Sequence, residues 1–294
     1  MRILILGGTG MLGHTLWDHF SQRFPDTYAT IRKNRNSYDP GGRFNSSRII
    51  DFVEADDFIE LAGVMKCVRP DFILNCIGVT KRREEACEAL RTITLNALLP
   101  HKLVEWGKTN FAKVINFSTD CVFNGEQGNY TEESPTNATD FYGKTKALGE
   151  IQGNNALTLR SSFIGTELGP GTELLEWFLS QTGRVKGFTN AIYTGLTTLE
   201  LSRIIEQILL HNPGANGIYN VSSDPISKYA LLILIKDKLH LGVDVIPDTI
   251  FRCDRSLNST KFRKEFNYTP PTWETMIDEL SKHIFKKSSS GGIK

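Results

Sequence analysis

A tyrosine and a lysine four residues apart are the clearest catalytic candidates in this sequence. Tyr142 and Lys146 lie at the start of a predicted helix, where this spacing puts both side chains on one face. A tyrosine phenol has a pKa of about 10, and a nearby ammonium stabilises the phenolate and lowers that pKa. The pair predicts proton transfer at a substrate oxygen. The alternative is an exposed pair on an ordinary amphipathic helix.

Thr119 supplies a hydroxyl that could act beside this pair. It follows the apolar run Val114–Phe117, a predicted buried strand, and open α/β sheets bind ligands at the carboxyl ends of their strands. A hydroxyl there can stabilise charge that develops on a substrate oxygen. No residue nearby in the sequence would activate the thiol of Cys121, so a pocket-lining thiol is favoured over a nucleophile. Thr119, Tyr142 and Lys146 are therefore the predicted catalytic residues.

Three glycines at intervals of three residues predict a dinucleotide site. Gly7, Gly10 and Gly13 lie between the apolar run Arg2–Leu6, a predicted strand, and Gly10–Arg23, which has helical periodicity. Here glycine permits a tight turn, close approach of the backbone to a pyrophosphate, and close packing of the helix. The start of the helix offers free N–H groups and the positive end of a dipole. The alternative is a plain strand-to-helix turn.

The end of the second predicted strand, Thr27–Arg32, indicates which nicotinamide cofactor is bound. An acidic residue at this point would favour NAD, because it binds the ribose 2′-hydroxyl. The sequence Arg32-Lys33-Asn34-Arg35 carries three cations and no carboxylate. Guanidinium groups suit a 2′-phosphate, so NADP(H) is preferred to NAD(H), with Arg32 and Lys33 as contacts. A solvated basic loop is the alternative.

Strands alternate with helical patterns over the first 160 residues, which predicts an α/β fold with a doubly wound parallel (Rossmann) sheet. A helical stretch over about 84–108 is interrupted at Leu99-Pro100, and another covers Phe141–Ile151. Later, Leu199–Leu210 predicts a helix, Gly217–Val221 a strand, and the C-terminal segment further helix. The other predicted strands are Ile49–Val53, Phe72–Ile77 and Leu157–Leu159.

The same pattern predicts how the chain is divided. Residues 1–165, together with about 190–222, form the NAD(P)-binding Rossmann domain. About 166–189 and 223–286 form a smaller C-terminal substrate-binding lobe that closes over the cofactor. The Ser/Gly-rich residues 287–294 form a flexible tail.

Composition narrows the classes of function. The 294 residues carry 34 basic and 33 acidic side chains, which gives no overall attraction to nucleic acid or to a membrane. Five cysteines, an odd number without CxxC spacing, favour reduced thiols and a cytoplasmic protein. The longest strongly apolar run, Tyr229–Ile235, is too short to cross a bilayer. The six histidines lack metal-ligand spacing, so no metal site is predicted.

Together these motifs resemble the extended short-chain dehydrogenase/reductase family, and within it the dTDP-4-dehydrorhamnose reductase-like branch. The resemblance covers most of the first 165 residues and is weaker around Arg255–Lys261. It rests on GGTGMLG (7–13), RPDFILNCIG (69–78), FSTDCVFNGEQGNYTEESP (117–135), FYGKTKALGE (141–150) and LRSSFIG (159–165).

The resemblance implies an NAD(P)H-dependent reductase of a nucleotide-linked 4-keto-deoxy sugar, in polysaccharide or nucleotide-sugar biosynthesis. Thr119, Tyr142 and Lys146 would be its catalytic triad. The implied cofactor contacts are Gly7, Gly10, Met11, Leu12, Gly13, Cys76, Ile77 and Gly78. The family often pairs two subunits through helices such as 84–108 and 141–151, so a homodimer is a further expectation.

The predicted substrate contacts are Thr80, Lys81, Asp120, Cys121 and Arg255. Lys81, Arg82 and Arg83 could meet a diphosphate or form a solvated helix start, and the resemblance makes Arg255 a second diphosphate candidate. The branch usually has tyrosine where this chain has Cys121, so the identity of the sugar is left open. Related dehydratases have Asp-Glu after the threonine. Cys121 replaces that glutamate here, and a thiol cannot simply serve as a carboxylate base.

Two other functions fit the same residues. One is a nucleotide-sugar epimerase that retains and recycles its cofactor. The other is a regulatory subunit that keeps the fold and the cofactor without turnover, as in the methionine adenosyltransferase regulatory subunit, which resembles the same branch. An intact Thr119, Tyr142 and Lys146 set favours the reductase.

Overall fold

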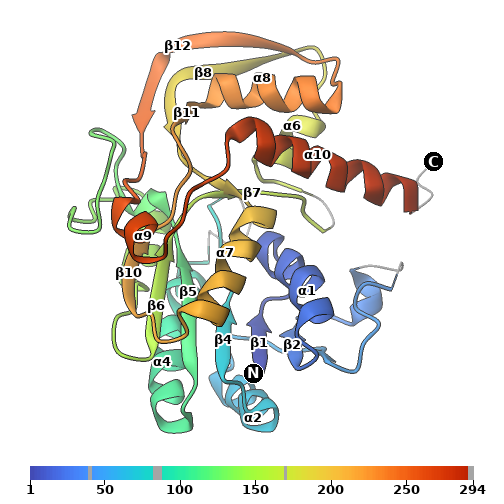
Figure 1. Cartoon of the computed structure of the whole chain (residues 1–294), viewed down its shortest axis with the longest axis vertical. Helices are drawn as coiled ribbons and strands as arrows, with labels where there is room; N and C mark the ends of the chain where they lie inside the picture. Colours follow the sequence, from blue (N-terminus) through green and yellow to red (C-terminus); the bar gives the residue numbers. More distant parts are fainter. Residues whose placement is uncertain (39–41, 82–87, 169–170, 291–294) are drawn as a thin grey trace.

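A seven-stranded parallel sheet forms the centre of the larger part of the protein (Figure 1). The computed structural model describes residues 1–38, 42–81, 88–168 and 171–290. The strand order is β10-β6-β5-β4-β1-β2-β3, and every pairing is parallel. This architecture confirms the predicted α/β class. The strands are β1 (Ile3–Leu6), β2 (Thr27–Thr30), β3 (Ile49–Ile50), β4 (Phe72–Asn75), β5 (Lys113–Ser118), β6 (Ala156–Arg160) and β10 (Gly217–Asn220).

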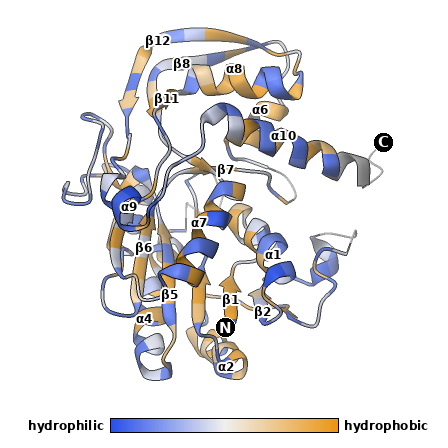
Figure 2. Cartoon of the chain, in the orientation of Figure 1, coloured by the Kyte–Doolittle hydropathy of each residue, from blue (hydrophilic) through white to orange (hydrophobic). Residues whose placement is uncertain are grey.

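Helices cover both faces of this sheet. They are α1 (Met11–Arg23), α2 (Phe58–Val68), α3 (Ala89–Ile93), α4 (Leu99–Asn110), α5 (Phe141–Leu148) and α7 (Thr198–His211), with short 3-10 turns η1 (Arg35–Ser37) and η4 (Asp120–Val122). Ile3 and Ile5 join a core cluster with α1 and α7, whereas Leu4 and Leu6 join another with α2 and α4. The central strands are therefore apolar along both faces, as Figure 2 shows for β1 and β4.

The long helical stretch continues through Leu99-Pro100, where an interruption was predicted. A π-helical segment, η3 (Thr94–Leu98), joins α3 to α4. Pro100 is tolerated because it lies in the first turn of α4. Residues 82–87, where the predicted helix begins, lie outside the described residues.

A second, three-stranded sheet lies beyond the carboxyl ends of the parallel strands (Figure 1). Its order is β11-β8-β12, with β8 parallel to β12 and antiparallel to β11. The short strands β7 and β9 form a separate, two-stranded parallel pair. These elements are β7 (Phe163–Ile164), α6 (Leu174–Leu179), β8 (Arg184–Tyr193), β9 (Leu196–Thr197), β11 (Ile226–Ser227), α8 (Lys228–Leu239), β12 (Asp244–Asp254), α9 (Thr260–Glu265) and α10 (Trp273–Ser290).

This smaller part differs from the sequence-based expectation. The long strands β8 and β12 were not predicted, and β8 crosses the proposed boundary at 189/190. α9 packs against β10 of the main sheet although its residues were assigned to the lobe. α10 continues to Ser290, into the expected tail, because each added residue gains a helical hydrogen bond. Within the described residues, no helix has both the length and the apolar composition needed to cross a membrane.

Candidate functional site

A cleft of about 600 Å³ lies between the carboxyl ends of the parallel strands and the three-stranded sheet. This is where open α/β sheets bind their ligands. All the predicted site residues except Gly13 and Lys33 line it, which brings together segments far apart in the sequence. These lining residues are Gly7, Gly10, Met11, Leu12, Arg32, Cys76, Ile77, Gly78, Thr80, Lys81, Thr119, Asp120, Cys121, Tyr142, Lys146 and Arg255.

The glycine loop closes one end of the cleft. Gly7 has a φ of +78°, a left-handed conformation that favours glycine. A side chain at Gly13 would overlap the carbonyl oxygen of Gly7, so Gly13 serves helix packing and does not face the cleft. No described side chain caps the start of α1, so no side-chain cap competes there with a ligand for its first N–H groups. These features fit the pyrophosphate of a dinucleotide.

The three cations after β2 have different environments. Arg32 and Lys33 are both exposed, but Arg32 lines the cleft and Lys33 lies outside the lining. The guanidinium of Arg35 forms a two-point ion pair with Asp51, with Nη2–Oδ1 at 2.7 Å and Nε–Oδ2 at 3.1 Å. Arg35 also donates to the carbonyl oxygen of Ser46 at 2.6 Å. Arg35 therefore organises the loop, and Arg32 is the member of the trio placed at the cofactor end.

Thr119 and Tyr142 come together because α5 packs directly on η4. The Oγ1 of Thr119 accepts a hydrogen bond from the Cys121 N–H at 3.1 Å and so starts the η4 turn. Asp140 caps α5 by accepting from the N–H of Gly143 at 2.8 Å. A side chain at Gly143 would overlap the carbonyl oxygen of Cys121, so this approach requires glycine. The Thr119 hydroxyl itself donates to the Oδ1 of Asp120 at 3.1 Å, and both Thr119 and Tyr142 line the cleft.

The pKa of Tyr142 is raised, whereas the sequence predicted that Lys146 would lower it. Burial is the largest cause, and it outweighs the lowering effect of the nearby Thr119 hydroxyl. The Nζ of Lys146 donates to the carbonyl oxygen of Phe117 at 2.6 Å. Burial lowers the pKa of Lys146 to about 8, opposed by the Glu150 carboxylate. Tyr142 therefore holds its proton near neutral pH.

Two buried polar residues that were not predicted support α5. Asn96, in η3, accepts from the Val79 N–H at 2.8 Å and donates to the Thr145 hydroxyl at 3.2 Å, which ties the Cys76–Thr80 loop to α5. Glu150, after α5, forms a two-point pair with Arg160, both distances 2.7 Å. Glu150 lay inside the quoted FYGKTKALGE motif. Asn96 gave no sequence signal, because the π-helical turn that aims its side chain has no recognisable pattern.

Among the predicted substrate contacts, the Nε of Arg255 donates to the Phe123 carbonyl oxygen at 2.8 Å, and its Nη1 lies 3.8 Å from the Cys121 sulfur. Burial raises the pKa of Cys121 to about 12, so its thiol stays protonated, as a pocket-lining role requires. The Thr80 hydroxyl donates to Glu173 at 2.8 Å. Lys81 also lines the cleft. Arg82 and Arg83 lie outside the described residues.

Further lining residues come from elements that the sequence did not predict. Phe188 and Tyr193 belong to β8, Phe251 to β12, and Glu173 immediately precedes α6. Burial raises the pKa of Tyr193, and its ring lies 5.6 Å from that of Trp273. The alternation of apolar and polar residues along β8 is the one signal that could have indicated this wall.

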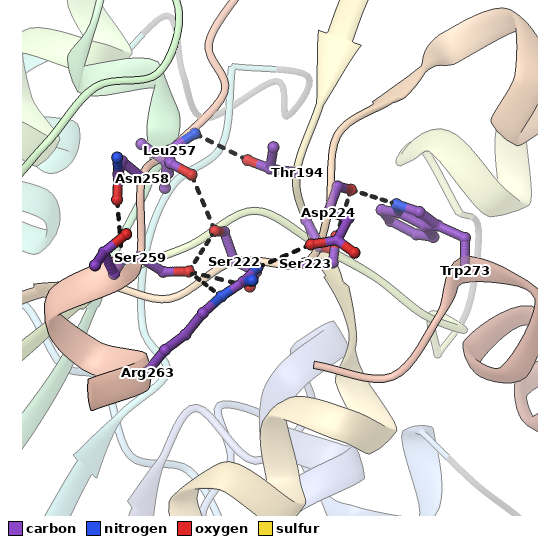
Figure 3. Close-up of polar contacts among 11 residues, drawn as sticks. Thr194, Ser222, Ser223, Asp224, Leu257, Asn258, Ser259, Arg263 and Trp273 are labelled. Carbon is purple, nitrogen blue, oxygen red and sulfur yellow. Dashed lines mark hydrogen bonds and ion pairs between the residues drawn. The ribbon is translucent and has the colours of Figure 1, made fainter. Parts of the chain in front are cut away.

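Hydrogen bonds hold the three-stranded sheet in place beside the main sheet (Figure 3). The Ser222 hydroxyl lies 3.0 Å from the Leu257 carbonyl oxygen and 2.8 Å from the Ser259 hydroxyl. Asp224 accepts from Arg263 through its carboxylate at 3.2 Å and from Trp273 through its carbonyl at 2.8 Å. Because β12 leads directly into this junction, the junction also fixes the position of Arg255.

Comparison with known proteins agrees with the predicted resemblance. Residues 1–180 match the family model described as the RmlD substrate binding domain. The chain is 23% identical to dTDP-4-dehydrorhamnose reductase of Salmonella typhimurium, over 97% of this chain and 98% of that protein. A shorter match, 28% identical over 51% of this chain, covers 41% of methionine adenosyltransferase 2 subunit beta of Mus musculus.

The fold comparison extends over nearly the whole chain. The crystal structure of dTDP-4-dehydrorhamnose reductase from Bacillus anthracis in complex with NADP superposes with a TM-score of 0.79. The two share 19% identity, over 96% of this chain and 99% of the other. The Rossmann-type fold predicted from the sequence is confirmed.

Proposed function

Because the chain belongs to the RmlD substrate binding domain family, we propose that it is an NADP(H)-dependent reductase of a nucleotide-linked 4-keto-deoxy sugar. Its place would be polysaccharide or nucleotide-sugar biosynthesis. The observation that carries this proposal is the meeting of Thr119, Tyr142 and Lys146 in the same cleft as the glycine loop. Reductases of such a sugar are among the relatives that match along their whole length.

In the proposed reaction, the bound nicotinamide supplies hydride to the keto carbon. Tyr142 donates its phenolic proton to the keto oxygen, for which its raised pKa keeps the proton in place. The hydroxyl of Thr119 would turn from the Asp120 carboxylate to the same oxygen and stabilise its developing charge. Lys146, one helical turn from Tyr142, then stabilises the phenolate that remains and can bond the nicotinamide ribose.

Two features support the cofactor assignment, the start of α1 and the position of Arg32 after β2. The uncapped start of α1 would hold the pyrophosphate, with Gly7, Gly10, Met11 and Leu12 around it. Arg32 would pair with a 2′-phosphate, which favours NADP(H) over NAD(H). The related enzyme from Bacillus anthracis was crystallised with NADP.

At the substrate end, Lys81 and Arg255 are the cations that could hold the diphosphate. Cys121, with a protonated thiol, would face the sugar as a small, weakly polar wall. The carboxylate of Glu173 and the Thr80 hydroxyl, which donates to it, would both accept hydrogen bonds from sugar hydroxyls.

We also propose a cytoplasmic homodimer. Its interface would include α3 and α4 with the end of α5, where apolar side chains are exposed. Leu90 is 84% exposed and Leu148 67% exposed. Cys67, Cys76, Cys121 and Cys253 are free, which suits a reducing compartment. Light scattering on the wild type and on Leu148→Glu would test the dimer, which should dissociate in the variant.

A regulatory subunit is the second candidate, since half of the chain also matches methionine adenosyltransferase 2 subunit beta. The deciding experiment follows NADPH consumption with a panel of dTDP-, UDP- and GDP-linked 4-keto-6-deoxy sugars. Turnover of one member by the wild type, and its loss in Tyr142→Phe with unchanged NADP(H) affinity, would support the reductase. Binding of NADP(H) without turnover of any member would favour the regulatory candidate.

A further inference from the structure

Tyr193 is a second tyrosine in the cleft, and the proposed proton transfer does not use it. It ends β8, lines the cleft and is only 8% exposed. Within the described part of the chain, its hydroxyl has no hydrogen-bond partner, yet it is not one of the unpartnered atoms that are sealed from solvent. The phenolic oxygen therefore opens into the cleft. Because buried polar groups in native proteins are nearly always hydrogen-bonded, an unpaired hydroxyl at this place points to a ligand.

The ring of Tyr193 is held in one position. It packs against the ring of Trp273 at 5.6 Å, with an interplanar angle of 39°. The indole N–H of Trp273 in turn donates to the carbonyl oxygen of Asp224 at 2.8 Å (Figure 3). A side chain at Gly195 would overlap the phenolic oxygen, so this position of the ring requires glycine there. The hydroxyl of Ser223 donates to the Gly195 carbonyl oxygen at 2.6 Å and fixes that backbone. The phenol is thus positioned before a ligand binds, which lowers the entropy cost of binding.

The side chains near the Tyr193 hydroxyl are mainly acceptors. Burial raises its pKa most, and Asp120, Cys121 and Glu173 raise it further. The same three side chains also raise the pKa of Tyr142, and all of these residues line the cleft. The two phenols therefore face one part of the cleft, in which the carboxylates can only accept hydrogen bonds. Tyr193, which keeps its proton, adds a donor to this part.

A donor and an acceptor in the same part of the cleft suit a hydroxyl group of the ligand. A sugar hydroxyl can accept from Tyr193 and donate to the Glu173 carboxylate, whereas a keto or ether oxygen can only accept. A carbon without oxygen would leave both groups unpaired, and an unpaired buried hydroxyl is costly. In a 4-keto-6-deoxy sugar, one neighbour of the keto carbon carries a hydroxyl, and the other carries a methyl group and the ring oxygen. The 3-hydroxyl is therefore the hydroxyl next to the oxygen that Tyr142 would protonate.

We propose that Tyr193 determines specificity by donating a hydrogen bond to the 3-hydroxyl of the keto sugar, with Glu173 accepting from the same hydroxyl. The inference rests on the proposed function, in which the ligand is a nucleotide-linked 4-keto-deoxy sugar, and it narrows the substrate class. Sugars that retain the 3-hydroxyl are bound, whereas their 3-deoxy counterparts are selected against. A site that pairs with a substrate hydroxyl discriminates strongly against the analogue that lacks it.

Calorimetry on the full chain, loaded with NADP, tests this without turnover. The ligands are dTDP-4-keto-6-deoxyglucose, its 3-deoxy counterpart and dTDP. The wild type should bind the first at least about tenfold more tightly than the second. Tyr193→Phe keeps the ring and its packing but removes the donor. It should weaken binding of the 3-hydroxy sugar by about threefold to tenfold and leave the other two affinities unchanged.

Tyr219→Phe is the matched control. Tyr219 also carries a largely buried hydroxyl, which donates to Glu265 at 2.6 Å, but it lies outside the cleft lining. This variant should bind all three ligands like the wild type. An equal loss of affinity in both variants would show that removal of any buried phenol disturbs the site, and it would contradict the assignment to Tyr193.

Unchanged affinity of Tyr193→Phe for the 3-hydroxy sugar would overturn the assignment. So would an equal loss for all three ligands, because dTDP lacks the hydroxyl to which the phenol is assigned. NADPH oxidation, measured separately on the 3-hydroxy sugar, keeps the two proposals apart. Turnover with equal binding of both sugars would refute this inference alone, whereas selective binding without turnover would support it and count against the reductase. Keto sugars that bind no better than dTDP would refute both.

Discussion

Replacement of Lys146 by methionine should stabilise the fold and abolish turnover. The ammonium group is buried, with the residue only 7% exposed, and its hydrogen bond to the carbonyl oxygen of Phe117 is 2.6 Å long. Burial lowers its pKa from 10.5 to about 8. Holding the charged form in this position therefore costs stability, which the protein tolerates at a site that we propose to be catalytic.

The size of the effect follows from the pKa. A fall from 10.5 to about 8 corresponds to about 3 kcal/mol of unfavourable free energy for the charged lysine at neutral pH. The variant also loses the hydrogen bond to the Phe117 carbonyl oxygen, which lowers its free energy of unfolding by ~1 kcal/mol. A methionine of similar length should therefore raise the free energy of unfolding by about 2 kcal/mol at pH 7.

The advantage of the variant should depend on pH. Between pH 8 and 10.5, the unfolded wild type binds more protons than the folded protein, because the pKa of Lys146 is lower in the folded state. Wild-type stability then rises with pH across this window, and the difference from the variant shrinks. Urea unfolding at pH 7 and pH 10, without cofactor, measures both values.

Lys144→Met is the matched control, since Lys144 is an exposed lysine on the same helix. It should change neither the stability nor the turnover. If Lys146→Met proves less stable than wild type at pH 7, or keeps the same advantage at pH 10, burial is not what sets the pKa of Lys146. NADPH oxidation with an accepted keto sugar should be undetectable in Lys146→Met and normal in Lys144→Met.

Three further predictions concern cofactor binding and the fold. Arg32→Asp should move the ratio of NADP to NAD affinities toward NAD in a fluorescence titration, and an unchanged ratio would refute the 2′-phosphate role. Gly13→Ala should lose cofactor affinity at least about tenfold, because its methyl group would overlap the Gly7 carbonyl oxygen; wild-type affinity would mean that the loop can shift freely. Glu150→Gln should lower the free energy of unfolding by about 3–5 kcal/mol, since it leaves the buried Arg160 unpaired, whereas a loss below about 1 kcal/mol would indicate that water reaches the guanidinium.

The cofactor half of the cleft was predictable because its signals are local. Strands covered on both faces must be apolar throughout, which made β1, β4 and β5 visible as short runs. The glycine loop and the Tyr142–Lys146 spacing each lie within a few residues, so the turn and helix geometry alone bring their groups together. The order of these segments along the chain then placed them at one edge of the sheet.

The substrate half depends on contacts between distant residues. β12 is exposed along most of its length and contains Pro247, so its sequence has neither the apolar run nor the clean alternation of a strand. It forms because it pairs with β8, about sixty residues earlier, in a register that begins with Asp244 opposite Arg184. The pairing of β12 with β8 then shifts in register between Asp248 and Arg252, and this irregularity has no signature in the sequence.

The direction of the Tyr142 pKa shift also depended on the folded structure. The neighbouring charge of Lys146, which favours the phenolate, was visible from the spacing of the two residues, but the extent to which burial outweighs such a charge was not. The raised pKa keeps the phenol protonated, which is the form that a reductase needs at the start of its reaction. Oxidation of an alcohol would need the phenolate first, and burial opposes that form. Burial alone thus makes the phenol a weaker proton donor, so the proposed reduction depends on the Lys146 ammonium to stabilise the phenolate that donation leaves.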